Sequence, residues 1–121
     1  MSKRGDLECV SDINQAIKRI EAYTKDINYQ EFLEDIKTQD AVVRNLEIIG
    51  EAAKNISAAF KKKHKSIEWK SIAGMRDKLI HHYFGVSPVI VWGVVKEKLP
   101  ELRRQLESIL RSGAQSRSRP K

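Results

Sequence analysis

The chain has little cysteine, little proline and no long apolar run. Its single cysteine, Cys9, cannot form a disulfide within the chain, and the same count excludes a cysteine-based metal cluster. No segment approaches the roughly 18 consecutive apolar residues that span a membrane. The N-terminal residues MSKRGDLEC lack the apolar core of a signal peptide. From these absences we expect a single-domain cytoplasmic protein.

The charge that is present is basic and concentrated. The chain has 23 lysines and arginines against 16 aspartates and glutamates, a net charge of +7. One basic cluster is KKKHK at 61–65, and the other is the C-terminal end from Arg111 onwards. Basic clusters attract phosphate backbones, but a solvated helix end followed by a floppy tail gives the same pattern. Charge therefore permits an RNA partner without establishing one.

Helical periodicity runs through most of the chain. Apolar residues alternate at spacings of three and four, which is typical of amphipathic helices, and no strand pattern appears. The predicted helices cover residues 6–27, 29–37 (a short one), 39–62 and 69–82, with a last helix from Pro88 onwards. Asp6 is the expected N-cap of the first helix. We predict an all-α fold, an up-and-down bundle of four long helices plus a short one.

Two residues interrupt the predicted helices. Gly50 lies inside the helix over 39–62, where glycine costs roughly 1 kcal/mol relative to alanine. We interpret it as a place where another backbone approaches closely. Pro100 should kink or break the last helix near Leu99, because proline cannot continue the backbone hydrogen-bond pattern.

The C-terminal residues differ in composition from the rest. After Arg111 the sequence SGAQSRSRPK has no periodicity and almost no apolar content. Such a segment cannot bury enough apolar surface to offset the entropy of ordering it. We therefore predict a helical domain over 1–111 and a disordered basic tail over 112–121.

The segment GMRDKLIHHYFG at 74–85 gathers Arg76, His81, His82 and Tyr83. On an ideal helix His81 lies about 140° from Arg76, whereas Tyr83 returns to within about 20° of it. One straight helix therefore cannot bring Arg76 and His81 to the same phosphate. Either the helix ends at His81 and the chain turns, or a second copy of the chain completes the site.

These residue types fit RNA cleavage. A histidine titrates near neutral pH, and an arginine forks onto phosphate oxygens. Together they could cleave RNA without a metal, by deprotonating a 2′-hydroxyl that displaces the 5′-oxygen and leaves a cyclic phosphate. Tyr83 could position a phosphate or stack on a base. The same pattern also fits an ordinary helix end, in which His81 and Tyr83 are half-buried and Arg76 makes a surface ion pair.

A family resemblance favours the catalytic interpretation. The segments RDKLIHHY and, upstream, DAVVRNLEIIGEAAKNIS resemble the HepT family, the toxin members of the HEPN superfamily of all-helical ribonucleases. The resemblance runs from about residue 10 to 110. It implies a homodimer in which Arg76 and His81 form a metal-independent endoribonuclease site between two protomers. Asp77 matches the polar residue that commonly follows the arginine.

The resemblance also implies a partner. HepT proteins are RNase toxins of type II toxin–antitoxin pairs, and the MntA-type antitoxin is a small nucleotidyltransferase that transfers AMP from ATP onto the motif tyrosine, here Tyr83. The added bulk and negative charge would repel RNA. His82 stands where family members often have an acidic residue, and it is either an inert neighbour or a second phosphate contact. The alternative function is a non-catalytic HEPN binding module that docks a nucleotidyltransferase and supplies a nucleotide- or substrate-binding surface.

A polar stripe on the helix over 39–62 could support such a site. It consists of Arg44, Glu47, Glu51 and Asn55. Either Arg44 or Glu51 braces the catalytic helix or lines the cleft, or the stripe is simply a solvated helix face. Trp69 and Trp92 are expected in the core or at an interface. The sequence holds no pattern that predicts a cofactor or a metal.

Overall fold

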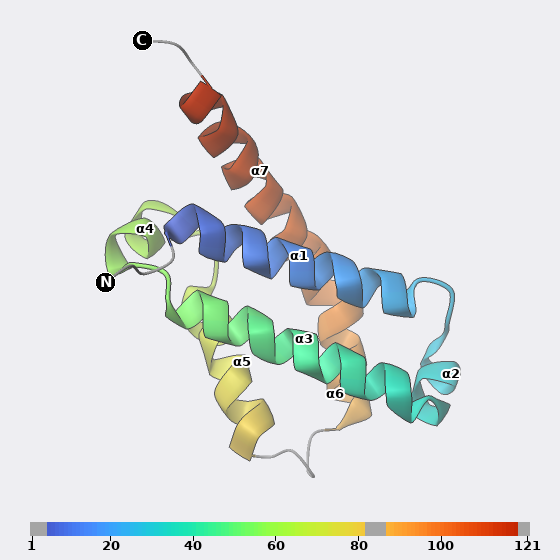
Figure 1. The fold of residues 1–121 in the computed structure, drawn as a ribbon. Coiled ribbons are helices and arrows are strands. Elements are labelled where there is room, and N and C mark those ends of the chain that lie inside the picture. Colours follow the sequence, from blue (N-terminus) through green and yellow to red (C-terminus); the bar gives the residue numbers. More distant parts are fainter. Residues whose placement is uncertain (1–4, 82–86, 119–121) are drawn as a thin grey trace.

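The fold consists of helices joined by short connections (Figure 1). The computed structural model describes residues 5–81 and 87–118, with the backbone alone at 78–81 and 114–118. The elements are α1 (Asp6–Thr24), α2 (Tyr29–Glu34), α3 (Ile36–Lys54), α4 (Ala58–Lys63), α5 (Trp69–His81), α6 (Pro88–Gly93), η2 (Val94–Lys98) and α7 (Leu99–Ser118). These described residues include no strand, so the predicted all-α class is confirmed. The structure contains a short helix, α4, in addition to the short helix α2 that was expected.

Three helices form one layer of the molecule. α3 packs against α1 on one side and against α5 on the other, and α7 packs across α1 (Figure 1). η2 connects α6 to α7, so the last three elements follow one another without a loop. Arg103 of α7 adds an ion pair to Glu21 of α1, with 3.1 Å between Nε and Oε2. This arrangement leaves the outer surface of α3 between the edges of α1 and α5.

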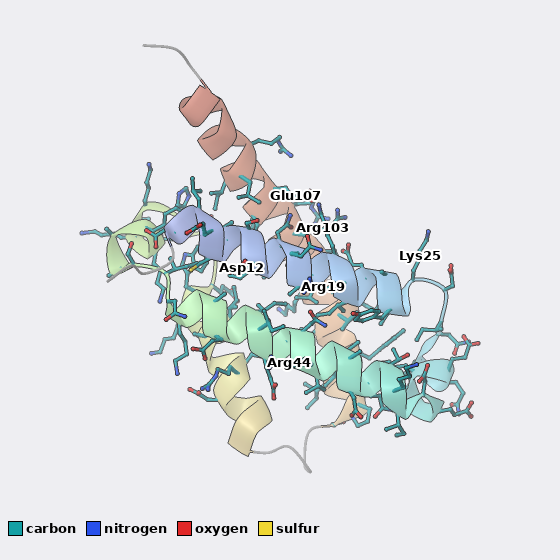
Figure 2. The ribbon with its side chains drawn as sticks, viewed as in Figure 1. Asp12, Arg19, Lys25, Arg44, Arg103 and Glu107 are labelled. Atoms are coloured by element: carbon teal, nitrogen blue, oxygen red, sulfur yellow. The ribbon has the colours of Figure 1, made fainter. Side chains whose placement is uncertain are left out.

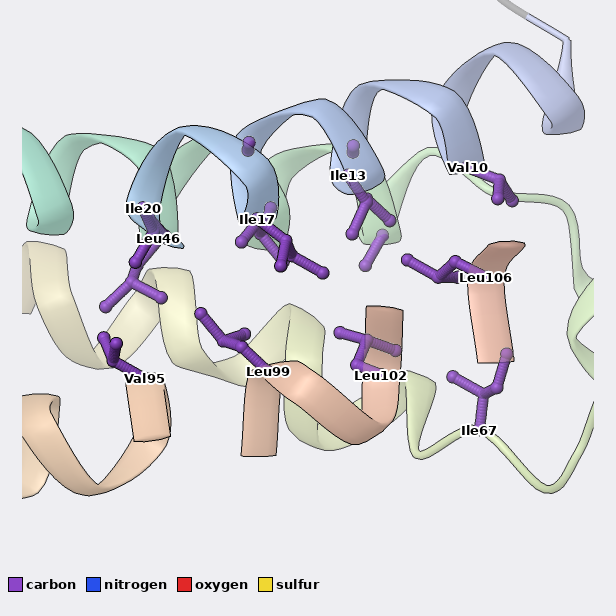
Figure 3. Close-up of a cluster of buried hydrophobic side chains, with 14 of the residues drawn as sticks. Val10, Ile13, Ile17, Ile20, Leu46, Ile67, Val95, Leu99, Leu102 and Leu106 are labelled. Atoms are coloured by element: carbon purple, nitrogen blue, oxygen red, sulfur yellow. The ribbon is translucent and has the colours of Figure 1, made fainter. Parts of the chain in front are cut away.

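The core lies between α1, α3 and the C-terminal helices (Figure 3). The apolar stripe of α1 is buried there, as are Leu99, Leu102 and Leu106 at the same spacing on α7, whereas Ile109 is partly buried. The central residues are Val10, Ile13, Ile17, Ile20, Leu46, Leu99 and Leu106. Burying a side chain of this size contributes about 1.5–3 kcal/mol, so these stripes supply most of the drive for folding.

Trp69 lies in the core, one of the two positions expected for the tryptophans, and Trp92 is partly buried against the core. Trp69 is buried, and its Nε1 donates a hydrogen bond to the carbonyl oxygen of His64 at 3.0 Å. Trp92 packs against Phe32, with ring centroids 5.0 Å apart, and the Lys96 ammonium lies 4.7 Å from the Trp92 ring centroid. Their rings are therefore occupied by contacts within the fold.

The predicted single helix over 39–62 is wrong, because α3 ends at Lys54 and α4 begins at Ala58. Ser57 is the N-cap of α4, and its Oγ accepts a hydrogen bond from the Phe60 amide at 3.1 Å. Asp6 was expected to cap α1, but Gly5 occupies that position. The Asp6 carboxylate instead accepts hydrogen bonds from the Ser57 amide at 2.8 Å and the Ser57 hydroxyl at 2.7 Å. Side chains that satisfy backbone donors in this way compete with helix continuation.

The short helix expected over 29–37 also ends early. Asp35 separates α2 from α3 and is the N-cap of α3. Its carboxylate accepts hydrogen bonds from the Thr38 hydroxyl at 2.6 Å and the Thr38 amide at 3.0 Å. The hydroxyl and then the amide stabilise the ionised form, which lowers the pKa of Asp35 below its ordinary value of 3.8.

Pro100 changes the last helix where the sequence predicted it. The Leu99 amide bonds to the Val94 carbonyl, five residues back, so η2 is a widened π-helical turn. This turn lies directly before Pro100, which cannot donate a backbone hydrogen bond. The helix is altered there without being interrupted.

The disordered tail predicted from residue 112 is wrong over residues 112–118, since the backbone of α7 is helical as far as Ser118. Gly113 packs against Leu7 of α1, where an added Cβ would lie 2.9 Å from Leu7 Cδ1. Extending a formed helix costs far less than nucleating one. The domain boundary at residue 111 stays a prediction. Over 5–81 and 87–118, no helix has the length and apolar content needed to cross a membrane.

Candidate active site

Gly50 allows α5 to approach α3 at Arg76. A Cβ built on Gly50 would lie 2.5 Å from Arg76 Cβ and 3.0 Å from the Arg76 amide nitrogen. Real Cβ atoms essentially never approach that closely, so only glycine fits. The close backbone approach expected at Gly50 is therefore present, and the backbone that approaches is the one that carries the predicted catalytic arginine.

The Arg76 side chain is held by two carboxylates. Its Nε lies 2.6 Å from Glu51 Oε1, and its Nη1 lies 3.4 Å from Asp77 Oδ1. Asp77 is in turn 3.6 Å from the Lys54 ammonium, a second link between α5 and α3. The Arg76 side chain is 31% exposed and that of Glu51 53% exposed, so solvent weakens the pair and it adds at most about 1 kcal/mol to stability. The contact fixes where the guanidinium lies more than it stabilises the fold.

The Glu51 contact leaves part of the guanidinium available. An arginine carries five N–H groups in a planar fork. Glu51 engages Nε, which leaves Nη2 and part of Nη1 for a further acceptor. A phosphate can take two parallel hydrogen bonds from such a fork.

Arg76 lies in a cavity of about 530 Å³ on the outer side of the α1–α3–α5 layer. α1 contributes Cys9 and Asp12, α5 contributes Arg76, and α3 contributes the rest. These residues are Arg44, Glu47, Ile48, Glu51 and Ala52 of α3 and Asn55, its C-cap. Figure 2 labels Asp12 on α1 and Arg44 on α3. The polar stripe predicted on α3 thus lies in one concave surface with Arg76.

The cavity is not basic. Its lining includes three carboxylates, from Asp12, Glu47 and Glu51, and two guanidinium groups. Arg44 is close to Glu47, with 3.6 Å between Nη1 and Oε1. A phosphodiester entering this cavity would need more positive charge than these lining residues supply.

The remaining predicted residues follow Arg76 along α5. His81 is the last residue of α5, and the structure gives its backbone but not its side chain. His82 and Tyr83 lie outside the described residues. Because the backbone from Arg76 to His81 is helical, these two residues are about 140° apart around the α5 axis.

The sequence did not predict that Asp12, Cys9 and Lys54 lie near the Arg76 site. Asp12 and Cys9 belong to the first helix, and nothing in its periodicity shows that this edge of the helix faces the Arg76 cavity. Lys54 was also missed, although it lies three residues after Glu51 and so on the same side of α3. Among the described residues, no group of three or more histidines, cysteines, aspartates or glutamates is arranged to hold a metal ion.

Comparison with known proteins identifies the family. Residues 13–109 match the family described as "Ribonuclease HepT-like". The chain therefore belongs to the HepT-like ribonuclease family, and the resemblance noted in the sequence is confirmed.

Individual relatives agree with this assignment. A protein of Thermococcus cleftensis named as a probable ribonuclease HepT is 50% identical over 107 residues, which are 88% of this chain and 97% of the relative. A candidate RNase of Methanocaldococcus jannaschii is 43% identical over 111 residues, 92% of each chain. A candidate RNase of Caldanaerobacter subterraneus is 50% identical over 86 residues, 71% of this chain and 77% of the relative. No solved structure matches the chain.

Proposed function

We propose that this chain is a metal-independent endoribonuclease and the toxin of a type II toxin–antitoxin pair. Membership of a ribonuclease family supports the RNase activity. The observation that carries the proposal is the placement of Arg76, which Gly50 and Glu51 hold in a cavity with its outer N–H groups available. Arg76 then binds the scissile phosphate and stabilises the charge that builds up on its oxygens.

His81 performs the proton transfers. It accepts the proton of the 2′-hydroxyl, whose oxygen attacks the adjacent phosphorus. The bond from phosphorus to the 5′-oxygen breaks, and that oxygen leaves with a proton donated by the protonated His81 imidazole. The products are a 2′,3′-cyclic phosphate and a 5′-hydroxyl, so atoms and charge balance without a further reactant.

The proposed active unit is a homodimer. Arg76 and His81 are about 140° apart around α5, so one α5 cannot direct both at a single phosphate. The cavity is open to solvent, so a second copy laid over it would complete its walls. A twofold axis near α5 places each Arg76 close to the motif of the other chain.

Tyr83 is the proposed control point, as in the family that the motif resembles. A nucleotidyltransferase antitoxin joins the tyrosine oxygen to the α-phosphorus of ATP, and pyrophosphate leaves. The AMP group adds bulk and a negative charge to the motif, and both would repel RNA. Intact mass after co-expression with that partner should show additions of about 329 Da on Tyr83, the mass of an AMP residue.

The decisive test is cleavage by the purified protein in EDTA. Wild type should cut RNA and leave 2′,3′-cyclic ends, and Arg76→Ala and His81→Ala should lose the activity. Lys18→Ala should keep it, because it removes one exposed cation that lines neither the Arg76 cavity nor any other described cavity. A strict Mg²⁺ requirement would refute the mechanism. If the wild-type chain neither cuts RNA nor arrests growth when expressed alone, the non-catalytic binding module is the better description.

A further inference from the structure

A second concave surface lies between α7 and the loop that follows α4. It has a volume of about 370 Å³. Its polar lining residues are His64, Ser66, Arg104, Gln105 and Ser108. Among the described residues that line it, none is a carboxylate. This α4–α7 groove thus differs in charge from the Arg76 cavity, where carboxylates outnumber guanidinium groups.

Further cations flank the α4–α7 groove. Lys62, Lys63 and Lys65 are exposed beside His64 and Ser66. Arg111 is exposed seven residues after Arg104, so the two lie about 20° apart around α7 and about 10 Å apart along it. The basic cluster KKKHK therefore supplies His64 to the lining, and Lys62, Lys63, Lys65 and Arg111 lie on the same segments that form the groove.

These cations have no carboxylate partner among the described residues. The ion pairs there join other residues, such as Lys54, Arg76 and Arg103. Exposed carboxylates exist on the adjoining elements, at Glu68 and Glu101, but neither lines the groove. The positive charge of the groove is therefore available to an anion.

We propose that the α4–α7 groove binds the phosphodiester backbone of an RNA strand outside the cleavage cavity. Lysine and arginine neutralise phosphates, while serine, glutamine and histidine donate hydrogen bonds to phosphate oxygens without reading sequence. The choice of RNA as the polyanion rests on the proposed function, whereas the groove itself does not. Such a site increases affinity for long strands because one strand engages two surfaces of the protein.

The surface chemistry favours RNA over a protein partner. Protein interfaces bury apolar and aromatic residues at their centres. In the described residues, the large apolar side chains that are exposed are Tyr23, Ile36, Val89 and Ile90. They belong to α1, α3 and α6, and none lies on α4 or α7. The groove thus offers cations and hydrogen-bond donors without an exposed apolar anchor.

The test is binding of a fluorescent single-stranded oligoribonucleotide to the full chain carrying His81→Ala, so that the RNA stays intact. Lys65→Glu with Arg104→Glu reverses two charges at the groove. Lys18→Glu with Lys37→Glu is the matched control, because both lysines are exposed on α1 and α3 and the net charge changes equally. Lys65→Gln with Arg104→Gln removes the two positive charges without reversing them. Circular dichroism checks that every variant is folded.

Losing two phosphate contacts should weaken binding about 25-fold at about 0.1 M salt and lower the slope of log K against log salt by about 1.4. The control pair should bind as the parent does. If both groove variants match the control in affinity and slope, the inference is overturned. It is also overturned if they bind RNA normally but lose the nucleotidyltransferase, because the groove would then dock a protein.

Parallel cleavage assays separate this inference from the proposed function. If the wild-type chain binds RNA through the groove but does not cut it, the inference holds and the proposed catalysis fails. If the wild-type chain cuts RNA while the groove variants bind like the control, the catalysis holds and the inference fails.

Discussion

Replacing Gly50 by alanine tests the packing that places Arg76. The new methyl group would lie 2.5 Å from Arg76 Cβ and 3.1 Å from its Cα. These atoms cannot rotate away, so α3 and α5 must separate by roughly 1 Å to restore an ordinary contact. Gly74, on α5 itself, is the matched control, because a Cβ built there meets nothing within 4 Å apart from its chain neighbours and the nearby backbone of its own helix.

The two substitutions should change the free energy of unfolding in opposite directions. Alanine gains about 1 kcal/mol over glycine in a helix interior, and this gain applies at both positions. At Gly50 the overpacking costs about 1–3 kcal/mol, and we expect the upper half of that range because the neighbour is backbone. Gly50→Ala should therefore lose about 1–2 kcal/mol of unfolding free energy, while Gly74→Ala should gain up to about 1 kcal/mol.

Thermal unfolding at one protein concentration measures the difference. The two variants have the same composition, and their midpoints should differ by roughly 10 °C with the wild type between them. Gly50→Ala should also cut RNA up to about 100-fold more slowly, because the cleavage geometry tolerates little displacement of Arg76. A Gly50→Ala protein as stable as Gly74→Ala would refute the close approach of the two helices.

Three further changes have expected outcomes. Glu51→Ala should change unfolding free energy by less than about 1 kcal/mol, since the pair is half-exposed. It should nevertheless lower kcat roughly tenfold by releasing Arg76, with partial rescue by Glu51→Gln, and an unchanged kcat would contradict that positioning role. Because the folded state lowers the pKa of Asp35, the stability from its ionised form is present above its ordinary pKa of 3.8 and is lost as pH falls through the folded value. Asp35→Asn should therefore show a shallower loss of stability in acid than the wild type, measured by urea unfolding between pH 5 and 2. Leu106→Ala removes a fully buried side chain and should cost about 2–5 kcal/mol in the same urea assay, whereas a loss below 1 kcal/mol would argue against the α7 packing.

Periodicity determined most of the helices but not where they break. The apolar stripes of α1 and α7 are local patterns, because a helix places residues three and four apart on one face wherever it lies. The break between α3 and α4 is marked by the Ser57 cap, which is local, and by the contact of Ser57 with Asp6, which joins residues far apart in the sequence. The periodicity continues past that point, so the apolar spacing alone predicts one uninterrupted helix.

The candidate site was predicted to a similar extent. Arg76, Glu51 and Arg44 were selected from motif and spacing, and Gly50 from the cost of a glycine in a helix. The sequence did not show that α5 is the helix that approaches Gly50, or that Glu51 contacts Arg76. Both depend on how α3 packs against α5.

The sequence by itself determined the helical class, the apolar faces and the residue types able to cleave RNA, because these follow from spacing and side-chain chemistry. Only the tertiary structure decided that Asp12 of α1 shares a cavity with Arg76 and that His64 and Ser66, which follow α4, line a groove with Arg104 of α7. Such pairs are set by the packing of whole helices, which depends on the shapes of both surfaces at once and leaves no periodic signal in either segment.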